Sequence, residues 1–336
     1  MPYRFAIIGC GRIAQKHAQL IAKQGILAAV CDIDLSRAQK LASAYGAACY
    51  DNTHTLFKEN RIDIVCVCSP NGWHEAHSIE ALQQGCHVLC EKPMAIRSES
   101  AARMLEVSQQ TGKKLYVVKQ NRFNPPVVAV KKMLDKGSLG TIHAFQMNCF
   151  WNRPHAYFKD DWRGTLQWDG GTLFTQFSHF IDLLYWMLGD LGTASGYREN
   201  ALHQGIIEFE DQGAALLHMR SGTRGVLQYT LNAYEKNMEG SITLFGDRGT
   251  VKIGGAYLNR LDHFSVEGEM HPFLGEGSEP NKYGTYEGSM SNHPAVYDQL
   301  FRDLENTENA LVEASEALQT VSIIEKIYDG SPLTRG

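Results

Sequence analysis

The chain has 336 residues, more than one ordinary hydrophobic core can hold, so we expect two domains. Its 43% apolar and 21% charged residues are typical of a soluble globular protein of enzyme size. A formal net charge of −5 and a pI near 6.2 argue against a non-specific nucleic-acid binder.

The sequence predicts a cytoplasmic protein with neither a membrane nor a nucleic-acid partner. No apolar run approaches the roughly 18 residues of a membrane helix, and Tyr3–Ile8 leads directly into a glycine turn rather than a signal peptide. All eight cysteines lie in the first half without a C-x-x-C pair, so we expect reduced thiols. We also expect no metal, because His74-Glu75-Ala76-His77 lacks the H-E-x-x-H spacing of zinc proteases.

A glycine turn follows the first predicted strand, 3–8, and opens a predicted helix over 12–24. The pattern G-x-G-x-x-A between a strand and a helix is typical of dinucleotide binding. Its first glycine makes the tight turn, and its second lets the pyrophosphate approach the backbone. From this turn we assign to the cofactor site Gly9, Gly11, Arg12 and Ile13.

Asp32 ends the second predicted strand, 28–31, about twenty residues beyond the glycine turn. A carboxylate at this position accepts hydrogen bonds from a ribose diol and repels a 2′-phosphate. The sequence therefore favours NAD over NADP. Arg37, in the next helix, keeps NADP open as an alternative.

Strands and helices then alternate as in a doubly wound parallel sheet. The predicted helices are 36–45, 53–60, 74–84 and 98–111, and the predicted strands are 47–50, 63–68, 87–90 and 115–119. Loops after the carboxyl ends of such strands line one crevice. These loops carry Ser69, Asn71, Glu91, Lys92, Gln120 and Asn121.

Lys92 is a candidate site residue because of where its strand ends. The apolar run 88–90 is typical of a buried parallel strand, and Pro93 prevents the strand from continuing. An isolated lysine after a strand is more often a solvated side chain. The edge that Lys92 shares with the glycine turn and Asp32 favours a functional role.

After residue 121 the alternation stops, so we predict a dinucleotide-binding domain over 1–121 and a second domain over 122–336. The predicted fold class is α/β, with an N-terminal Rossmann doubly wound parallel sheet and a C-terminal α+β domain that has a large, mostly antiparallel sheet. Predicted helices are 125–136, 173–188, 294–304 and 310–328. Predicted strands are 141–151, 205–209, 214–220, 226–232, 241–245 and 250–253, and 271–291 is predicted to be a mobile loop.

His179 lies among apolar residues of the predicted helix 173–188. Such a histidine is usually a core residue, but Thr175 is one helical turn away on the same face, and histidine exchanges protons readily near neutral pH. We therefore expect a nicotinamide held by the first domain, with a sugar or alcohol held between it and the second. Lys92 and His179 would handle the hydroxyl proton while hydride passes to the nicotinamide.

Together these motifs resemble the Gfo/Idh/MocA oxidoreductase family, in the right order along essentially the whole chain. Within it the chain most resembles bacterial dehydrogenases that oxidise C3 of UDP-N-acetylglucosamine-type sugars for surface-polysaccharide (lipopolysaccharide) synthesis. The best known act on UDP-N-acetyl-2-amino-2-deoxyglucuronate. The segments that carry this likeness are Val118–Arg122, Phe150–Pro154, Tyr157, Trp162–Thr165, Asp169–Gly171 and Gln176–Leu184.

The resemblance implies roles for individual residues. Lys92 would bind the reacting hydroxyl beside the nicotinamide, and His179 would be the acid/base. The other implied cofactor residues are Ser69, Asn71, His74, Glu91, Gln120, Trp162 and Arg163. The other implied substrate residues are Asn121, Arg153, Tyr157, Arg163, Thr175 and Gln176. Many family members have Asp or Asn where this chain has Thr175, and a threonine does not anchor a proton relay as a carboxylate does.

The resemblance also implies a cis Lys92-Pro93 bond in many relatives and a homodimer or homotetramer packed sheet to sheet. Apolar positions on both faces of the predicted sheet, for example Ile206, Leu216 and Leu227, agree with such packing.

Two alternatives remain open at this point. One is the same fold acting on another polyol, such as an inositol or a free aldose. The aromatic and basic loop Phe150–Arg163 favours a nucleotide diphosphate instead. The other is a catalytically inactive NAD-binding sensor, which the presence of both Lys92 and His179 disfavours. The sequence leaves open whether the sugar carries a 6-carboxylate and whether a 2-keto acid re-oxidises NADH in place.

Overall fold

The structure, a computed structural model, describes residues 2–159, 162–282, 287–305 and 314–334. The chain forms two compact units. Unit 1 consists of Met1–Val118 and His293–Val321, and unit 2 consists of Lys119–Asn292 and Ser322–Gly336. Across the described ranges, no helix combines the length and the apolar character that crossing a membrane requires.

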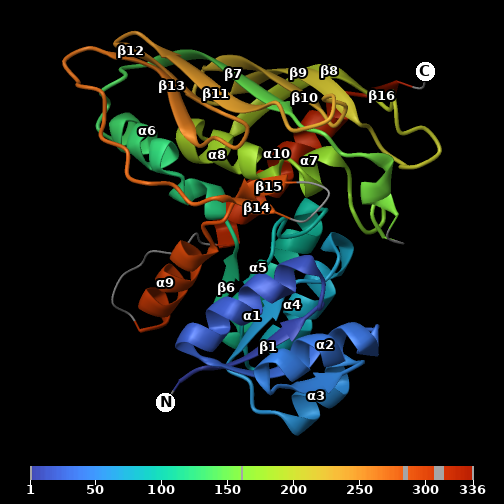
Figure 1. Ribbon diagram of the computed structural model, residues 1–336. Coiled ribbons are helices and arrows are strands. Elements are labelled where there is room, and N and C mark those ends of the chain that lie inside the picture. The colour runs from blue at the N-terminus through green and yellow to red at the C-terminus, as the bar shows by residue number, and fades with distance from the viewer. Residues whose placement is uncertain (1, 160–161, 283–286, 306–313, 335–336) are drawn as a thin grey trace. The chain divides into compact units, whose positions relative to one another are not determined.

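Unit 1 is built on a parallel sheet whose described strands run in the order β3-β2-β1-β4-β5-β6 (Figure 1). They are β1 (Arg4–Ile8), β2 (Ile26–Cys31), β3 (Ala48–Tyr50), β4 (Ile64–Val67), β5 (His87–Cys90) and β6 (Leu115–Val117). All four residues of β4 are buried, as expected for a strand that is covered on both faces. Because β1 pairs in parallel with β2 and with β4, the carboxyl ends of these strands meet at one edge.

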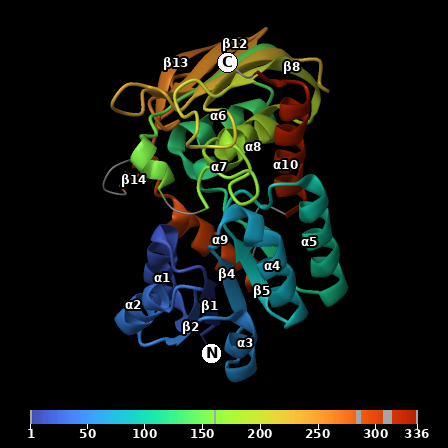
Figure 2. The same cartoon turned by 90° about the vertical axis from the view of Figure 1, so that its right-hand side faces the viewer.

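Helices lie on both sides of this sheet, with α1 and α2 on one side and α4 and α5 on the other (Figure 2). Their bounds are α1 (Arg12–Gln24), α2 (Leu35–Tyr45), α3 (Thr53–Glu59), α4 (His74–Gln83) and α5 (Ser98–Thr111). Local sequence sets their ends. The Asp34 carboxylate accepts a hydrogen bond from the Ser36 N–H at the start of α2, and Gly46 ends this helix with a φ of 66°.

Helix α9 (His293–Leu304) belongs to unit 1 although it follows most of unit 2 along the chain. The Tyr297 ring contacts Phe5 of β1, with 6.3 Å between the ring centroids. The Asp303 carboxylate accepts a hydrogen bond from the Tyr116 hydroxyl of β6 at 2.5 Å. Unit 1 is therefore completed by a segment from near the end of the chain.

Unit 2 is built on a second sheet, whose described strands run in the order β13-β12-β11-β7-β10-β9-β8-β16. They are β7 (Ile142–Phe150), β8 (Leu191–Glu199), β9 (Gln212–Met219), β10 (Arg224–Thr230), β11 (Glu239–Gly246), β12 (Gly249–Gly254), β13 (Arg260–Val266) and β16 (Leu333–Thr334). The pairings β7–β10 and β8–β16 are parallel and the others are antiparallel. A separate ladder joins β14 (Pro280–Lys282) to β15 (Glu287–Met290).

One face of the second sheet forms the core of unit 2. Along β10, Leu227 and Tyr229 are buried while Val226 and Gln228 are exposed, the two-residue period of a sheet that is covered on one face. Helices lie against the covered face (Figures 1 and 2); they are α6 (Pro125–Asp135), α7 (Thr172–Thr175) and α8 (Ser178–Leu188).

The structure confirms the predicted fold class, with a parallel Rossmann-type sheet and a mostly antiparallel sheet. The units differ from the domain bounds 1–121 and 122–336, because 293–321 cluster with unit 1. The boundary near the end of the chain falls within α10 (Ala314–Asp329). The sequence alone does not show this return, because the pattern of α9 predicts a helix but not the sheet against which it packs.

Some element predictions were wrong. The predicted strand 205–209 is a series of turns and bends, and the strand that precedes β9 in the chain is β8 (Leu191–Glu199). Apart from Leu191 and Tyr197, the residues of β8 are small or polar, so the sequence has little of the alternating apolar pattern that predicts a strand. The predicted helix 173–188 is two helices in the structure, because α7 ends at Thr175 and α8 begins at Ser178. The predicted loop 271–291 contains β14 and β15, and its residues 283–286 lie outside the described ranges.

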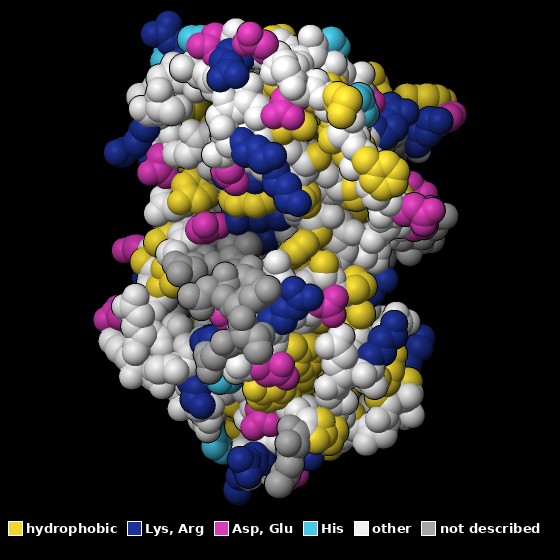
Figure 3. Space-filling model, turned by 90° about the vertical axis from the view of Figure 1, so that its left-hand side faces the viewer, with side chains coloured by type: hydrophobic (Ala, Val, Ile, Leu, Met, Phe, Trp, Pro, Cys, Tyr) yellow, Lys and Arg dark blue, Asp and Glu magenta, His cyan; other side chains and the backbone are white. Residues whose placement is uncertain are grey.

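Side chains of both signs, Lys and Arg as well as Asp and Glu, are scattered over the face that Figure 3 shows. This distribution agrees with the small net charge of −5.

Candidate functional site

The glycine turn of unit 1 has the geometry that a dinucleotide requires. Gly9 has a φ of 91°, and a Cβ atom there would lie 2.5 Å from the Ser69 backbone nitrogen. At Gly11 a Cβ atom would meet nothing within 4 Å, so the space before the start of α1 is open. Gly11 also offers α1 no side-chain cap, and the N–H groups at the start of a helix are the groups that bind a phosphate. These residues fit the pyrophosphate of a dinucleotide.

Asp32 lies beside this turn, at the end of β2. One carboxylate oxygen accepts a hydrogen bond from the Cys10 N–H at 2.7 Å, and the other accepts one from the Asp34 N–H at 2.9 Å. Each oxygen keeps a further lone pair that a ribose hydroxyl can use. The carboxylate is thus fixed by backbone groups in the orientation in which a ribose diol can bind.

His74 connects the loops that follow β4 and β5. Its ring nitrogens lie 2.7 Å from the Pro93 carbonyl oxygen and 2.9 Å from the Ser69 carbonyl oxygen. Burial lowers the pKa of His74, so the neutral ring donates to only one of these carbonyls at a time. His74 holds the two loops together, and whether it also touches a cofactor stays a prediction. Asn71 lies in the same region, in the 3₁₀ helix η1 (Asn71–Trp73).

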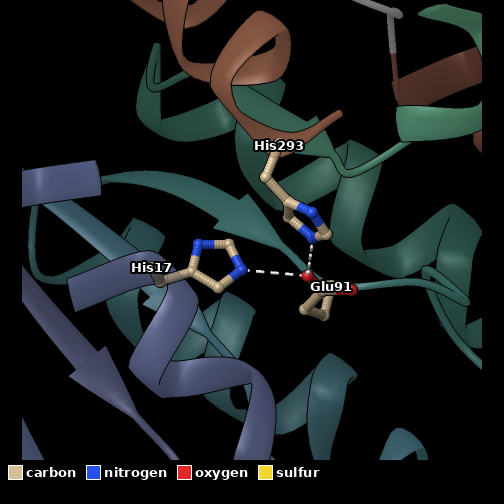
Figure 4. A group of neighbouring side chains, drawn as sticks. All are labelled: His17, Glu91 and His293. Atoms are coloured by element: carbon tan, nitrogen blue, oxygen red, sulfur yellow. Dashed lines mark hydrogen bonds and ion pairs between the residues drawn. The ribbon is translucent and has the colours of Figure 1, made fainter. Parts of the chain in front are cut away.

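Glu91 forms a buried cluster with two histidines, as Figure 4 shows. One oxygen of its carboxylate lies 2.9 Å from His17 Nε2 and 3.2 Å from His293 Nε2. The other oxygen accepts a hydrogen bond from the Lys92 N–H at 3.1 Å. The Lys92-Pro93 bond is cis. The Glu91 carboxylate thus holds the backbone at the residue predicted to bind the reacting hydroxyl.

The ionisation of this cluster is uneven. Burial raises the pKa of Glu91, but hydrogen bonds from His17 and His293 outweigh it and hold the pKa well below its ordinary value. Burial also opposes charge on His17, yet its interactions with Cys68 and Tyr297 are among those that place its pKa well above the ordinary value. Burial lowers the pKa of His293. These directions agree with an ionised Glu91, a protonated His17 and a neutral His293.

The same three residues carry donor atoms that all lie within 4.8 Å of one another, a set that could hold a metal ion. Both imidazole Nε2 atoms are directly hydrogen bonded to one carboxylate oxygen. A metal would require both nitrogens in their unprotonated form. A protonated His17 and a bound metal ion are therefore alternatives at this cluster.

In unit 2, Gln120 and Asn121 lie in the 3₁₀ helix η2 (Gln120–Phe123). The Gln120 carbonyl oxygen accepts a hydrogen bond from the Asn292 side-chain amide at 3.3 Å. Asn121 is buried, and neither atom of its side-chain amide has a hydrogen-bond partner among the described residues. A buried amide of this kind is satisfied by a ligand or a water, which agrees with its predicted role in substrate binding.

Four predicted substrate residues form one connected group in unit 2. The Arg153 guanidinium donates to the Gln176 side-chain oxygen at 2.7 Å, and the Gln176 amide donates to the Tyr157 hydroxyl at 2.8 Å. Arg163 lies over the Tyr157 ring, 5.1 Å from its centroid, and over the Trp162 ring at 4.6 Å. Guanidinium groups stacked on aromatic rings provide flat, cationic surfaces suited to phosphates and to a base.

His179 lies near the start of α8 and is 2% exposed. The expected arrangement with Thr175 on the same face of one continuous helix was wrong, because α7 ends at Thr175 and α8 begins at Ser178. The two residues between the helices, Gln176 and Phe177, form a turn and contact distant residues. Gln176 bonds to Arg153 as described, and the Phe177 ring contacts the Trp151 ring, with 5.2 Å between the centroids.

Asp182, on the same helix as His179, forms a buried ion cluster that we did not predict. Its carboxylate lies 3.0 Å from Lys119 Nζ and accepts a hydrogen bond from Arg122 Nε at 2.8 Å. All three side chains are at most 7% exposed. Burial raises the pKa of Asp182, but Lys119 and Arg122 outweigh it and hold that pKa below its ordinary value. The cluster fixes α8 to the segment that opens unit 2.

The structure thus places the predicted residues in two groups, one in each unit. The group in unit 1 contains Gly9, Gly11, Arg12, Ile13, Asp32, Ser69, Asn71, His74, Glu91 and Lys92, which all follow carboxyl ends of the parallel strands. Sequence reasoning missed His17 and His293. The available signal was His17 itself, a histidine on the buried face of α1 with Ala14, Ala18 and Ile21.

Asp182→Asn should lower the free energy of unfolding by about 3 to 5 kcal/mol at neutral pH, because it leaves two buried cations without their counter-ion. Since the folded-state pKa of Asp182 is depressed, its contribution is present above the unfolded pKa of about 3.9 and is lost as pH falls below it. The difference between variant and wild type should therefore shrink in acid. Guanidinium unfolding at several pH values measures it.

Asp135→Asn is the matched control. Asp135 pairs with Lys131 at 2.6 Å, but its side chain is 60% exposed, so we expect a change within about 0.5 kcal/mol. Equal effects of the two substitutions would contradict a stabilising role for the buried cluster.

Comparisons with known proteins agree with this geometry. Residues 3–119 match the family described as "Oxidoreductase family, NAD-binding Rossmann fold", and residues 127–252 match the "GFO/IDH/MocA C-terminal domain". The first match identifies unit 1 as an NAD-binding unit, and its glycine turn and Asp32 fit that cofactor.

Solved and curated relatives extend the likeness. The chain is similar to the WlbA dehydrogenase from Bordetella pertussis, solved in complex with NADH and UDP-GlcNAcA, at 34% identity and a TM-score of 0.88, covering 98% of this chain and 96% of that one. The D-glucoside 3-dehydrogenase of Escherichia coli K12 is 40% identical over 146 residues, which is 42% of each chain. Inositol 2-dehydrogenase 2 of Saccharopolyspora erythraea is 28% identical over 75% of this chain and 74% of that protein.

The two family matches follow one another in order, and the likeness to WlbA extends over nearly the whole length of both chains. The chain therefore belongs to the Gfo/Idh/MocA family of oxidoreductases.

Proposed function

We propose that the protein oxidises the C3 hydroxyl of a UDP-N-acetylglucosamine-type sugar, either UDP-GlcNAc or its 6-carboxylate UDP-GlcNAcA, to the 3-keto sugar with NAD. The observation that carries this proposal is the connected group of Arg153, Gln176, Tyr157 and Arg163 in unit 2. A small neutral polyol has no use for two guanidinium groups on aromatic rings, whereas a nucleoside diphosphate does. The likeness to WlbA supports the same substrate class.

The residues of unit 1 would hold and orient the cofactor. The N–H groups after Gly11 would bind the pyrophosphate, and Asp32 would bind the adenosine ribose. When bound, NAD supplies the acceptor for the hydride. Lys92 stands where its strand ends, with its backbone held by Glu91, so that its ammonium group can bind the reacting hydroxyl. Gln120, Trp162 and Arg163 are proposed to complete the cofactor site.

The hydroxyl proton has to leave as the hydride does. We assign its transfer to His179, assisted by Lys92, because imidazole accepts a proton near neutral pH. Asn121, Arg153, Tyr157, Thr175 and Gln176 would position the sugar nucleotide. Thr175 lacks a carboxylate, so its role is to orient a neighbour rather than to relay a proton.

The assay that tests this function follows NADH absorbance with a panel of UDP-GlcNAc, UDP-GlcNAcA, myo-inositol, glucose and a simple glucoside. We expect turnover with one of the UDP-sugars. Turnover only with inositol or a glucoside would place the protein with those relatives. Absence of turnover with every substrate, together with tight NAD binding, would favour a sensor. Adding a 2-keto acid to the assay would reveal re-oxidation of NADH in place.

Lys92→Ala and His179→Ala should each lower turnover by about a hundredfold or more, the usual contribution of a positioned acid or base, while NAD affinity changes little. The double variant should lose much less than the product of the two effects if both side chains act on one proton. Thr175→Ala should cost less than either. Near-normal turnover of His179→Ala from about pH 6 to 9 would instead make His179 a core residue.

NAD should bind about a hundredfold more tightly than NADP. The Asp32 carboxylate would repel the 2′-phosphate by a few kcal/mol at an intermediate dielectric constant. Fluorescence titration with both cofactors measures the ratio. Asp32→Asn, which keeps acceptor groups but removes the charge, should reduce that ratio to about tenfold or less.

Asp63→Asn is the control for the cofactor ratio, since Asp63 precedes β4 and bonds to the Arg4 N–H at the opposite end of the sheet. It should leave the ratio unchanged. Equal affinities of wild type for NAD and NADP would refute the role of Asp32.

We further propose that the outer face of the unit 2 sheet pairs with a second copy. Leu216 and Val226, paired on β9 and β10, are 55% and 39% exposed. Of the other two positions named for the two faces of the sheet, Leu227 lies on the buried face, and Ile206 lies in a turn outside the sheet. Light scattering should give a multiple of 37.5 kDa that Leu216→Glu reduces. Leu202→Glu, at an exposed leucine outside the strands, should not reduce it.

A further inference from the structure

The Glu91 carboxylate is the nearest buried charge to Lys92 along the chain. It is 7% exposed, and all of its described hydrogen bonds come from His17, His293 and the Lys92 N–H. A carboxylate removed from water requires a positive partner nearby. In this cluster, two imidazoles are the groups in hydrogen-bond contact that can supply it (Figure 4).

The hydrogen bonds identify which imidazole carries the charge. An imidazolium has two N–H donors and needs an acceptor for each. His17 has both, since its Nδ1 lies 2.8 Å from the Tyr297 hydroxyl and its Nε2 lies 2.9 Å from Glu91. The Tyr297 hydroxyl can in turn donate a hydrogen bond to Cys66 Sγ, which lies 3.3 Å away. His293 Nδ1 is buried without a hydrogen-bond partner in the described part of the chain.

We propose that His17 is a positioning residue for Lys92, because its imidazolium neutralises the Glu91 carboxylate and leaves Lys92 beside a cluster of zero net charge. An unbalanced carboxylate there would hold Lys92 in its ammonium form over a wider pH range. A lysine that has to exchange protons with a substrate hydroxyl works best without that bias. This inference rests on the proposed role of Lys92.

Other groups that face the cluster do not carry the compensating charge. Burial raises the pKa of Cys90 and Tyr297, raises that of Cys68 to about 11, and lowers that of His74, so all four are neutral near pH 7. The remaining facing groups are the Cys66 thiol, described above as an acceptor, and the Lys16 ammonium on α1, which is partly exposed and therefore screened by water.

The test measures the pKa of Lys92 directly, by competitive acetylation of the full-length protein at a series of pH values and mass spectrometry of the peptide that contains it. His17→Gln keeps a donor toward Glu91 but removes the positive charge. We expect it to raise the pKa of Lys92 by about one unit, the effect of one charge roughly 10 Å away at an effective dielectric constant near 20. The limb of the kcat/KM profile that reports Lys92 should move to higher pH by the same amount.

Three variants separate charge from structure. In Glu91→Gln the buried His17 loses its counter-ion and becomes neutral, so the net charge stays zero and the pKa of Lys92 should move by less than about 0.3 unit. His293→Gln replaces one neutral donor by another and should also leave it in place. His54→Gln, at an exposed histidine of α3, is the surface control. A shift that is equal in His17→Gln and His293→Gln, or absent from both, would overturn the proposal.

Wild-type protein provides a second measurement that does not depend on the folding of a variant. Nitrogen-15 NMR of labelled histidine should show both ring nitrogens of His17 protonated at pH 7. A neutral His17, or a stoichiometric metal ion held by the cluster, would overturn the proposal. Neither acetylation nor NMR requires a substrate. Failure of the UDP-sugar assay with the Lys92 shift intact would therefore refute the proposed function and leave the charge balance standing.

Discussion

A charged side chain that is buried in the protein needs partners there that neutralise it or form hydrogen bonds with it. Within each unit, such partners connect the helices and strands that carry the predicted site residues. Glu91 in unit 1 and Asp182 in unit 2 are buried carboxylates, and each is held by groups from other elements. A third such carboxylate, Glu210, accepts hydrogen bonds from Arg198 and from the Tyr328 hydroxyl. Each cluster joins elements that are distant in the sequence. Glu91 directly precedes Lys92, and Asp182 lies on the same helix as His179.

In unit 1 the same constraint concerns the carboxyl edge of the parallel sheet. Strand ends place Asp32 and Lys92 at this edge, but the strands alone do not fix their side chains. Backbone N–H groups fix the Asp32 carboxylate, and the Glu91 carboxylate fixes the Lys92 N–H. The balance of charge around Glu91 then sets the electrostatic field in which Lys92 ionises. The Glu91 cluster thus holds the Lys92 backbone and, in our proposal, also sets the pKa of the Lys92 side chain.

The sequence predicted best where local rules act. The alternation of apolar strands and helices, the glycine turn and the proline after Lys92 are local patterns, and the parallel sheet follows from them. It predicted least where tertiary contacts override local preference. β8 carries small and polar residues and was missed, while the apolar segment 205–209 was wrongly predicted as a strand. The break after Thr175 follows contacts of Gln176 and Phe177 that no periodicity reveals.

The partners of the buried carboxylates were beyond sequence reasoning for a related reason. His17 and His293 lie 74 and 202 residues from Glu91, and Lys119 and Arg122 lie about 60 residues from Asp182. A single sequence shows that a histidine or an aspartate is present, but not which distant charge it meets. The end of a buried strand and the proline after it pointed to Glu91 and Lys92, and nothing comparable in the sequence pointed to His293.

The return of α9 to unit 1 has a consequence for how the nucleotide-binding unit is built. His293 bonds to Glu91, Tyr297 bonds to His17, and Asp303 bonds to Tyr116 of the edge strand β6. A contiguous fragment that ended at residue 121 would lack all three contacts. The Glu91 carboxylate would keep one imidazole, and His17 would lose the acceptor of its second N–H. The charge balance beside Lys92 therefore depends on residues that are synthesised only after most of unit 2, so the cofactor-binding unit is complete only when most of the chain has been made.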